Sequence, residues 1–222
     1  MSYLPLADWN PAMDRLWRRQ GRRLTVPISR RAGWTIHHSA GSFGAGLDYA
    51  RWVADFHYHT RGWRRPGGYN FFIPEDPPDG LALEMCGLNF VGAHAAGHNT
   101  TTVGVCFQGS FGRRMPNAKQ LDCFARLAST VPVPNVQQRH RDVSGTACPG
   151  GRLAGAVPLP VAVPVQEEKE DIMAYLSEDD QKWLSEFVAA GREREESKPQ
   201  SLWHVLDWLR ADREFFARYF RS

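Results

Sequence analysis

The sequence lacks both a Cys-x-x-Cys pair and any run of 18 apolar residues. The absence of a long apolar run predicts no membrane-spanning helix and therefore no stable membrane insertion. The first 20 residues carry Asp8 and Asp14 and no apolar core segment, so we expect synthesis in the cytoplasm without a secretory signal peptide. The four cysteines are few and irregularly spaced, which argues against a disulfide framework. A pairing of Cys86 with Cys106 across neighbouring strands stays open.

The positive charge of the chain is unevenly distributed. Residues 1–165 hold 18 Lys and Arg against 10 Asp and Glu, whereas residues 166–222 hold 9 against 14, and the two parts together give the net charge of +3. A basic body suits an anionic polymer such as a cell wall. The arginines form no recognisable reading helix and no nucleic-acid motif is present, so we expect no nucleic-acid partner.

Apolar periodicity indicates strands that alternate with helices. We expect strands at 34–39, 69–73, 81–85, 102–108 and 135–139, and helices at 47–59 and 117–129. This alternation predicts an α+β fold with an α/β-like, three-layer arrangement, in which a mixed β-sheet is flanked by helices on both faces. A C-terminal helical appendage follows the sheet domain.

We expect four regions along the chain: an N-terminal arm at 1–31, a central domain at 32–153, a proline-punctuated linker at 154–166 and a helical C-terminal region at 167–222. The basic arm is either a solvated segment or a first helix lying on the domain, with binding to a wall as the alternative. The C-terminal helices either dock on the domain or self-associate, with targeting to a wall or membrane as the alternative. Their net acidity argues against an anionic membrane surface.

A histidine and a cysteine, His140 and Cys148, lie eight residues apart in a segment that Gly and Pro residues predict to be a loop. Two further histidines that could serve as ligands, His37 and His38, lie about a hundred residues upstream. Adjacent strand residues point to opposite faces, so only one of these two can face a metal. Two histidines and one cysteine leave the fourth position of a zinc ion open, which is typical of a catalytic site. The absence of a redox role favours zinc over iron or copper.

Five segments carry a family resemblance in chain order. They are Ile-His-His-Ser-Ala at 36–40, Gly-Tyr-Asn-Phe at 68–71, Val-Gly-Ala-His-Ala at 91–95, Thr-Val-Gly-Val-Cys at 102–106 and His-Arg-Asp-Val-Ser-Gly-Thr-Ala-Cys-Pro-Gly at 140–150. Together they resemble the zinc-dependent N-acetylmuramoyl-L-alanine amidases of the amidase-2 family, which includes phage endolysins and animal peptidoglycan recognition proteins. The match covers about residues 33–153, so the resemblance implies that the region at 32–153 is an amidase catalytic domain.

The resemblance implies hydrolysis of the amide between the lactyl group of N-acetylmuramic acid and the first L-Ala of the stem peptide. Carried over by position, the Zn²⁺ ligands are His37, His140 and Cys148, and peptidoglycan is the partner. Tyr69 and Thr146 are then catalytic residues whose hydroxyl groups would hydrogen-bond the tetrahedral oxyanion. Tyr69 also lines the substrate site.

Four further residues have two interpretations each. His94 either contacts substrate in the groove, with Asn99 beside it, or is a structural histidine held in its loop. Glu84 is the candidate general base, with an exposed strand glutamate as the alternative. Asp142 either orients a histidine ligand through a hydrogen bond or forms a turn.

We therefore expect a phage or prophage endolysin that acts on the cell wall after release through a holin. One alternative is a non-catalytic peptidoglycan-binding recognition protein, although such proteins usually lack the Cys ligand and Cys148 is present. A second alternative is a cytosolic amidase that recycles muropeptides. Many animal recognition proteins carry Gly-Trp or Asn-Phe where this chain has Gly87-Leu88, so a diaminopimelate or a lysine stem stays open.

Overall fold

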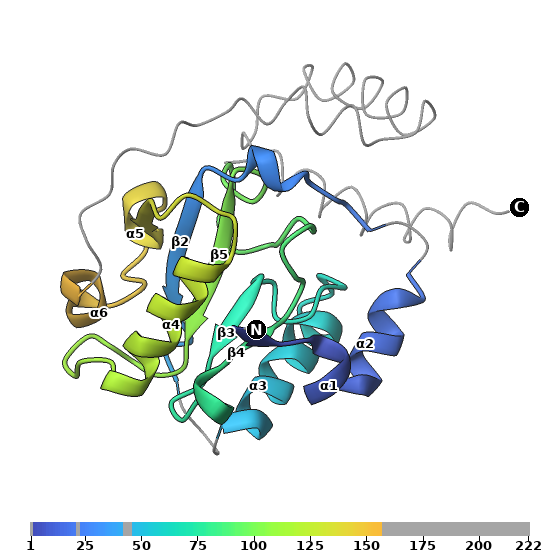
Figure 1. Cartoon of the computed structure of the whole chain (residues 1–222), viewed down its shortest axis with the longest axis horizontal. Coiled ribbons are helices and arrows are strands. Elements are labelled where there is room, and N and C mark those ends of the chain that lie inside the picture. The colour runs from blue at the N-terminus through green and yellow to red at the C-terminus, as the bar shows by residue number, and fades with distance from the viewer. Residues whose placement is uncertain (1, 21–22, 42–45, 157–222) are drawn as a thin grey trace, which may run out of the picture. The chain divides into compact units, whose positions relative to one another are not determined.

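A six-stranded sheet with the order β1-β4-β3-β5-β2-β6 organises the chain (Figure 1). This computed structural model describes residues 2–20, 23–41 and 46–156. The predicted linker from residue 157 and the predicted helical region at 167–222 lie outside the described residues. β4 is antiparallel to β3, and the other neighbouring strands are parallel. The strands are β1 Tyr3–Leu4, β2 Gly33–His38, β3 Phe71–Ile73, β4 Ala82–Glu84, β5 Thr102–Phe107 and β6 Gln137–Arg139.

Helices cover both faces of the sheet. α1 (Leu6–Trp9), α2 (Pro11–Arg18) and α3 (Gly46–Asp55) pack on one face, and α4 (Ala118–Thr130) and α6 (Gly151–Ala156) pack on the other (Figure 1). Successive side chains of β2 point to opposite faces of the sheet. Trp34 and Ile36 join the apolar cluster under α4, so Thr35 and His37 point to the other face. The predicted α+β fold, a mixed sheet flanked by helices, is confirmed. None of the helices among the described residues is long and apolar enough to cross a membrane.

The N-terminal residues belong to the sheet domain rather than forming a solvated arm. β1 pairs with β4, and the side chains of Trp9, Met13 and Trp17 are buried in the cluster beneath α3. The indole Nε1 of Trp9 donates to the backbone oxygen of Glu84 at 2.9 Å. α2 begins at Pro11 because Asn10 caps its N-terminus, accepting from the backbone N of Met13. The structure therefore shows the predicted first helix lying on the domain and not the predicted solvated segment.

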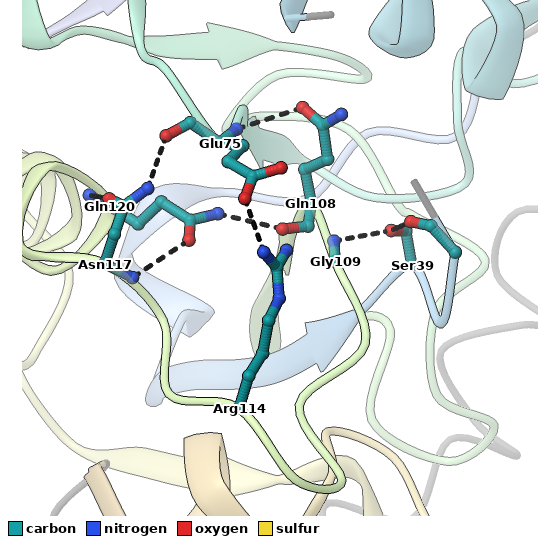
Figure 2. Close-up of polar contacts among 8 residues, drawn as sticks. Ser39, Glu75, Gln108, Gly109, Arg114, Asn117 and Gln120 are labelled. Carbon is teal, nitrogen blue, oxygen red and sulfur yellow. Dashed lines mark hydrogen bonds and ion pairs between the residues drawn. The ribbon is translucent and has the colours of Figure 1, made fainter. Parts of the chain in front are cut away.

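A polar network ties together the carboxyl ends of β2, β3 and β5 (Figure 2). The side-chain oxygen of the buried Gln108 accepts from the backbone N of Glu75, and its backbone oxygen accepts from the amide of Gln120. The hydroxyl of Ser39 accepts from the backbone N of Gly109 at 3.0 Å. Since Gln120 also completes the capping box at the start of α4, the network fixes three strand ends against one helix.

Several boundaries differ from those predicted. α3 continues as a π-helix over Phe56–Thr60, and short 3₁₀ turns occupy Ile28–Arg30 and Pro78–Gly80. The segment predicted as a loop begins with a single helical turn, α5 (His140–Val143), because its Gly and Pro residues start only after that turn. α6 runs past the predicted boundary at residue 153. All four cysteines are free, so Cys86 and Cys106 are not paired.

Candidate functional site

Three elements bring one histidine, a second histidine and one cysteine together at the carboxyl edge of the sheet. His37 lies near the end of β2, His140 follows β6, and Cys148 lies in the loop before α6. β2 and β6 are parallel neighbours, so the residues at their carboxyl ends meet. One donor atom from each of the three side chains lies within 4.8 Å of the other two. The Sγ atom of Cys148 is 3.8 Å from Nδ1 of His37, and the two imidazole ring centres are 4.5 Å apart.

The strand alternation separates His37 from His38. The His38 ring is held on Phe111, since its Nδ1 accepts from the backbone N of Phe111 at 3.3 Å. The backbone N of His38 contributes differently, since it donates to the Cys148 sulfur at 3.4 Å. The structure therefore places the His37 ring beside Cys148 and His140, as the sequence predicted, and uses the backbone of His38 to hold the sulfur.

His94 packs directly on His37. Nδ1 of His94 lies 3.2 Å from Nε2 of His37, so the nitrogen of His37 that faces away from Cys148 has a hydrogen-bond partner. The loop that carries His94 can approach because β5 has glycine at residue 104. A Cβ atom there would lie 2.4 Å from Cγ of the His94 ring. Asn99 fixes the same loop, since its side-chain oxygen accepts from the backbone N atoms of His94 and Ala95 at 2.8 and 3.0 Å.

A cavity of about 400 Å³ opens over this cluster. The Tyr69 and Thr146 side chains both line it, which places the two predicted hydroxyl groups beside the three donors. The Thr146 oxygen accepts from the backbone N of Cys148 at 3.2 Å, and the Tyr69 hydroxyl hydrogen-bonds the Cys106 thiol. The lining is formed by His37, His38, Ala40, Trp63, Tyr69, Ala93, His94, His140, Thr146, Ala147 and Cys148.

Burial governs the charge state of the cluster. It lowers the pKa of His37 far below its usual value and, with smaller effects of neighbouring residues, lowers that of His94 to about 3. The pKa of His140 is lowered for the same reason. Burial also raises the pKa of the Cys148 thiol to about 11, against the opposing effects of the His38 backbone N and of Arg141. The imidazoles are therefore neutral near pH 7, as metal ligands must be.

The remaining predicted residues lie elsewhere. The Glu84 carboxylate accepts from the backbone N of Leu6 at 3.1 Å, at the start of α1, and does not line the cavity. Asp142 accepts from the backbone N and side chain of Arg139, so it acts as a turn former and ion-pair partner rather than orienting a histidine. Asn99 is buried behind His94 and does not line the cavity either. The predictions of a general base at Glu84 and of substrate contact by Asn99 have no support in this geometry.

Comparison with known proteins agrees with this arrangement. The family model of the N-acetylmuramoyl-L-alanine amidases, amidase-2, matches residues 29–151, which is more than half of the chain. The chain belongs to the amidase-2 family. The matched region contains all three donor residues of the cluster and every residue that lines the cavity.

Several proteins to which this chain is similar come from animals. Peptidoglycan-recognition protein SC1a of Drosophila melanogaster is 32% identical over 151 residues, which are 62% of this chain and 78% of that protein. A human N-acetylmuramoyl-L-alanine amidase is 29% identical over 132 residues, 53% of this chain and 22% of that protein. A solved ectodomain complex of peptidoglycan recognition proteins LCa and LCx with bound tracheal cytotoxin has a TM-score of 0.58 at 27% identity, covering 71% of this chain and 95% of that chain.

Sequence reasoning missed one large side chain of this amidase-2 site. Trp63 lines the cavity although it lies in a Gly- and Pro-rich loop that was not assigned a role. An aromatic residue in a polar loop, a few residues before Tyr69, was the available signal. The contact of His94 with His37 was also missed, because it depends on how the loop folds back over β5.

Proposed function

We propose that this chain is a zinc-dependent N-acetylmuramoyl-L-alanine amidase, which hydrolyses the amide between the lactyl group of N-acetylmuramic acid and L-Ala of the peptidoglycan stem. The observation that carries the proposal is the cluster of His37, His140 and Cys148, whose donor atoms lie within 4.8 Å of one another at a cavity. Two imidazoles and one thiolate are a typical ligand set for catalytic zinc, because they leave a coordination position for the reaction.

The chemistry of the donors fits zinc. Both histidines are neutral near pH 7, and the thiol, whose pKa burial raises to about 11, loses its proton readily only when a cation is present. The hydrogen bond between His94 and His37 supplies the outer partner that metal-bound histidines usually have, and it fixes the ring orientation. A zinc ion held by these residues would supply Lewis-acid chemistry, which lowers the pKa of a water molecule and polarises a carbonyl group.

Two hydroxyl groups of the chain stabilise the charge that develops on the amide oxygen. Burial raises the pKa of Tyr69 well above its usual value, so its hydroxyl group stays protonated; its proton, which faces Cys106 in the structure, would turn to the amide oxygen to donate. The Thr146 oxygen already accepts from the Cys148 backbone N, which leaves its proton to donate to a second group. Each such donor is typically worth about 10²–10³ in rate. None of the described residues that line the cavity is Asp or Glu, so the lining offers no carboxylate as a general base.

The setting we propose is that of a phage or prophage endolysin that reaches the wall after release through a holin. The excess of positive charge in residues 1–165 supports an anionic polymer as substrate, and the amidase-2 site supports bond cleavage within it. Peptidoglycan is also the ligand class of relatives, because tracheal cytotoxin, a diaminopimelic acid-type peptidoglycan monomer, is bound in the solved recognition-protein complex.

Mass spectrometry of muropeptides tests the proposal. The purified protein is incubated with a defined muropeptide and with insoluble sacculi, in parallel with Cys148→Ala and with chelated wild type. We expect free stem peptide beginning at L-Ala from the wild type alone. Binding of the muropeptide by zinc-loaded protein without any cleavage would instead identify a recognition protein. Cleavage of soluble fragments but never of sacculi would favour the recycling amidase over the endolysin.

A further inference from the structure

Arg31 is a buried cation whose charge is not balanced by a carboxylate among the described residues. It lies between the 3₁₀ turn Ile28–Arg30 and β2, and only 2% of its surface is exposed. Burial lowers the pKa of Arg31 to about 10, so the guanidinium stays charged near pH 7. Burial also raises the pKa of the nearby Cys86 thiol to about 12, so this neighbour is uncharged. A buried charge needs compensation, and for Arg31 it must come from hydrogen bonds.

Backbone oxygen atoms supply this compensation. Both Nη atoms of the Arg31 guanidinium donate, and the acceptors lie at the two ends of one segment, residues 88–102. Nη2 donates to the oxygens of Leu88 and Phe90 at 3.2 and 2.7 Å, and Nη1 donates to those of Asn99, Thr100 and Thr102 at 2.8, 3.4 and 2.7 Å. A guanidinium presents its donors on a planar fork, whereas an ammonium group is a single point. Arg31 can therefore bond both ends of the segment at once.

The segment at 88–102 carries His94. The backbone oxygen of Asn99 accepts from Arg31, and the side-chain oxygen of the same Asn99 accepts from the backbone N of His94 at 2.8 Å. Nδ1 of His94 in turn lies 3.2 Å from Nε2 of His37. Successive contacts therefore lead from Arg31 to a histidine of the three-residue cluster. Arg31 itself does not line the cavity, so any effect on the cluster must pass through these contacts.

Asn70 holds the segment at 88–102 by a second route. Its Nδ2 atom donates to the backbone oxygen of Phe90 at 2.9 Å, and its Oδ1 atom accepts from the backbone N of Gly104 at 2.8 Å. Because these bonds do not involve Arg31, loss of the guanidinium should loosen the segment rather than release it from the sheet.

We propose that Arg31 is a positioning residue of the metal site, which sets the place of His94 against His37 and thereby the affinity of the cluster for zinc. The proposal rests on the proposed function, because it takes zinc as the metal held by His37, His140 and Cys148. Loss of the outer partner of a metal-bound histidine typically weakens metal affinity by about 10–100-fold. A displacement of His94 should have an effect at the lower end of that range, because the partner is shifted and not deleted.

Competition with a chromogenic chelator measures the zinc affinity of Arg31→Lys and Arg31→Met. Arg31→Lys keeps the positive charge but loses the fork, and Arg31→Met keeps an unbranched chain without any donor. We expect zinc affinity to fall about tenfold in Arg31→Lys and at least as far in Arg31→Met. Wild-type affinity in both variants would overturn the proposal. If Arg31→Met does not fold by circular dichroism, Arg31→Lys alone decides.

A matched control and a second background separate positioning from stability alone. Gln120→Ala is the control, because Gln120 is also buried and bonds a backbone oxygen but does not line the cavity; it should keep wild-type zinc affinity. In a His94→Ala background, Arg31→Lys should weaken zinc binding no further, because the residue that it positions is absent. The same loss of about tenfold in both backgrounds would overturn the positioning role.

Hydrogen exchange on metal-free protein tests the position of His94 directly. The backbone N–H of His94, which donates to Asn99, should exchange faster in Arg31→Lys than in wild type, and unchanged exchange would overturn the proposal.

Zinc affinity and turnover together keep this inference distinct from the proposed function. If the wild type binds zinc but cleaves no muropeptide, the proposed function fails, and the zinc affinities of the Arg31 variants still decide the role of Arg31. If the wild type cleaves muropeptides and both variants keep its zinc affinity, only the role of Arg31 fails. A wild type that binds no zinc would overturn both.

Discussion

Replacing Gly104 by alanine should dislodge His94 from His37 without touching either histidine. The added Cβ atom would lie 2.4 Å from Cγ and Cδ2 of the His94 ring and 2.9 Å from its Nδ1. Carbon atoms pack at about 3.5–4.0 Å, so the ring must retreat by about 1 Å or more. The hydrogen bond between His37 and His94 is already 3.2 Å long, and such a shift takes the two nitrogens beyond hydrogen-bonding distance.

The size of the effect follows from two contributions. Overpacking of a closed site costs about 1–3 kcal/mol, and a buried nitrogen of His37 left without a partner costs about 1–3 kcal/mol. Because the loop relaxes in part, we expect the free energy of unfolding to fall by about 2–4 kcal/mol. Loss of the outer partner of a metal-bound histidine typically weakens metal affinity by about 10–100-fold.

Urea denaturation and zinc competition against a chromogenic chelator measure the two effects. Gly112→Ala is the matched control, because a Cβ atom at Gly112 meets nothing within 4 Å. In a His94→Ala background, Gly104→Ala should lower the free energy of unfolding only slightly further, because the imidazole ring that the new methyl group would displace is absent. Wild-type stability and zinc affinity in Gly104→Ala would refute the role given to His94.

Three further predictions concern single residues. Tyr69→Phe should lower kcat by about 10²–10³ with little change in zinc affinity, measured by muropeptide turnover and chelator competition. The folded-state pKa of His57, about 4, lies below its unfolded value, so its contribution to stability is complete above about pH 6.5 and declines as the pH falls toward 4. Between pH 7.5 and pH 5.0, the free energy of unfolding, measured by urea denaturation of chelated protein, should therefore fall by about 2 kcal/mol less in His57→Gln than in wild type. His59→Gln is the control, because His59 is exposed and lies two residues later. Asn117→Ala should lower the free energy of unfolding by about 1 kcal/mol, because it removes the side chain that caps the N-terminus of α4. An unchanged midpoint in thermal denaturation would contradict this.

The central fold could be predicted because its sequence patterns are local. Strand β5, expected at 102–108, and helix α4, expected at 117–129, lie close to their predicted bounds. The spacing of apolar residues marked where α4 begins. β1 escaped prediction because a two-residue strand carries no periodicity, and Trp9 and Trp17 reveal their burial only when α3 is placed above them.

The candidate site could be predicted as far as its residues follow local rules. Alternation in β2 predicted that only one of His37 and His38 faces the cluster, and the family resemblance selected His37. The structure places the His37 ring beside Cys148. Glu84 was misjudged because its partner, the backbone N of Leu6, lies 78 residues away in sequence. The contact of His94 with His37 depends on a close approach to β5, which residue spacing alone does not reveal.

The most direct test of the account is a zinc titration of chelated protein, followed by the initial rate of muropeptide hydrolysis. We predict that the metal-free chain is inactive and that activity rises linearly to a break at one zinc per chain, with no recovery in Cys148→Ala. Full activity in the metal-free chain, or an inactive chain that carries one zinc at the His37, His140 and Cys148 cluster, would contradict it.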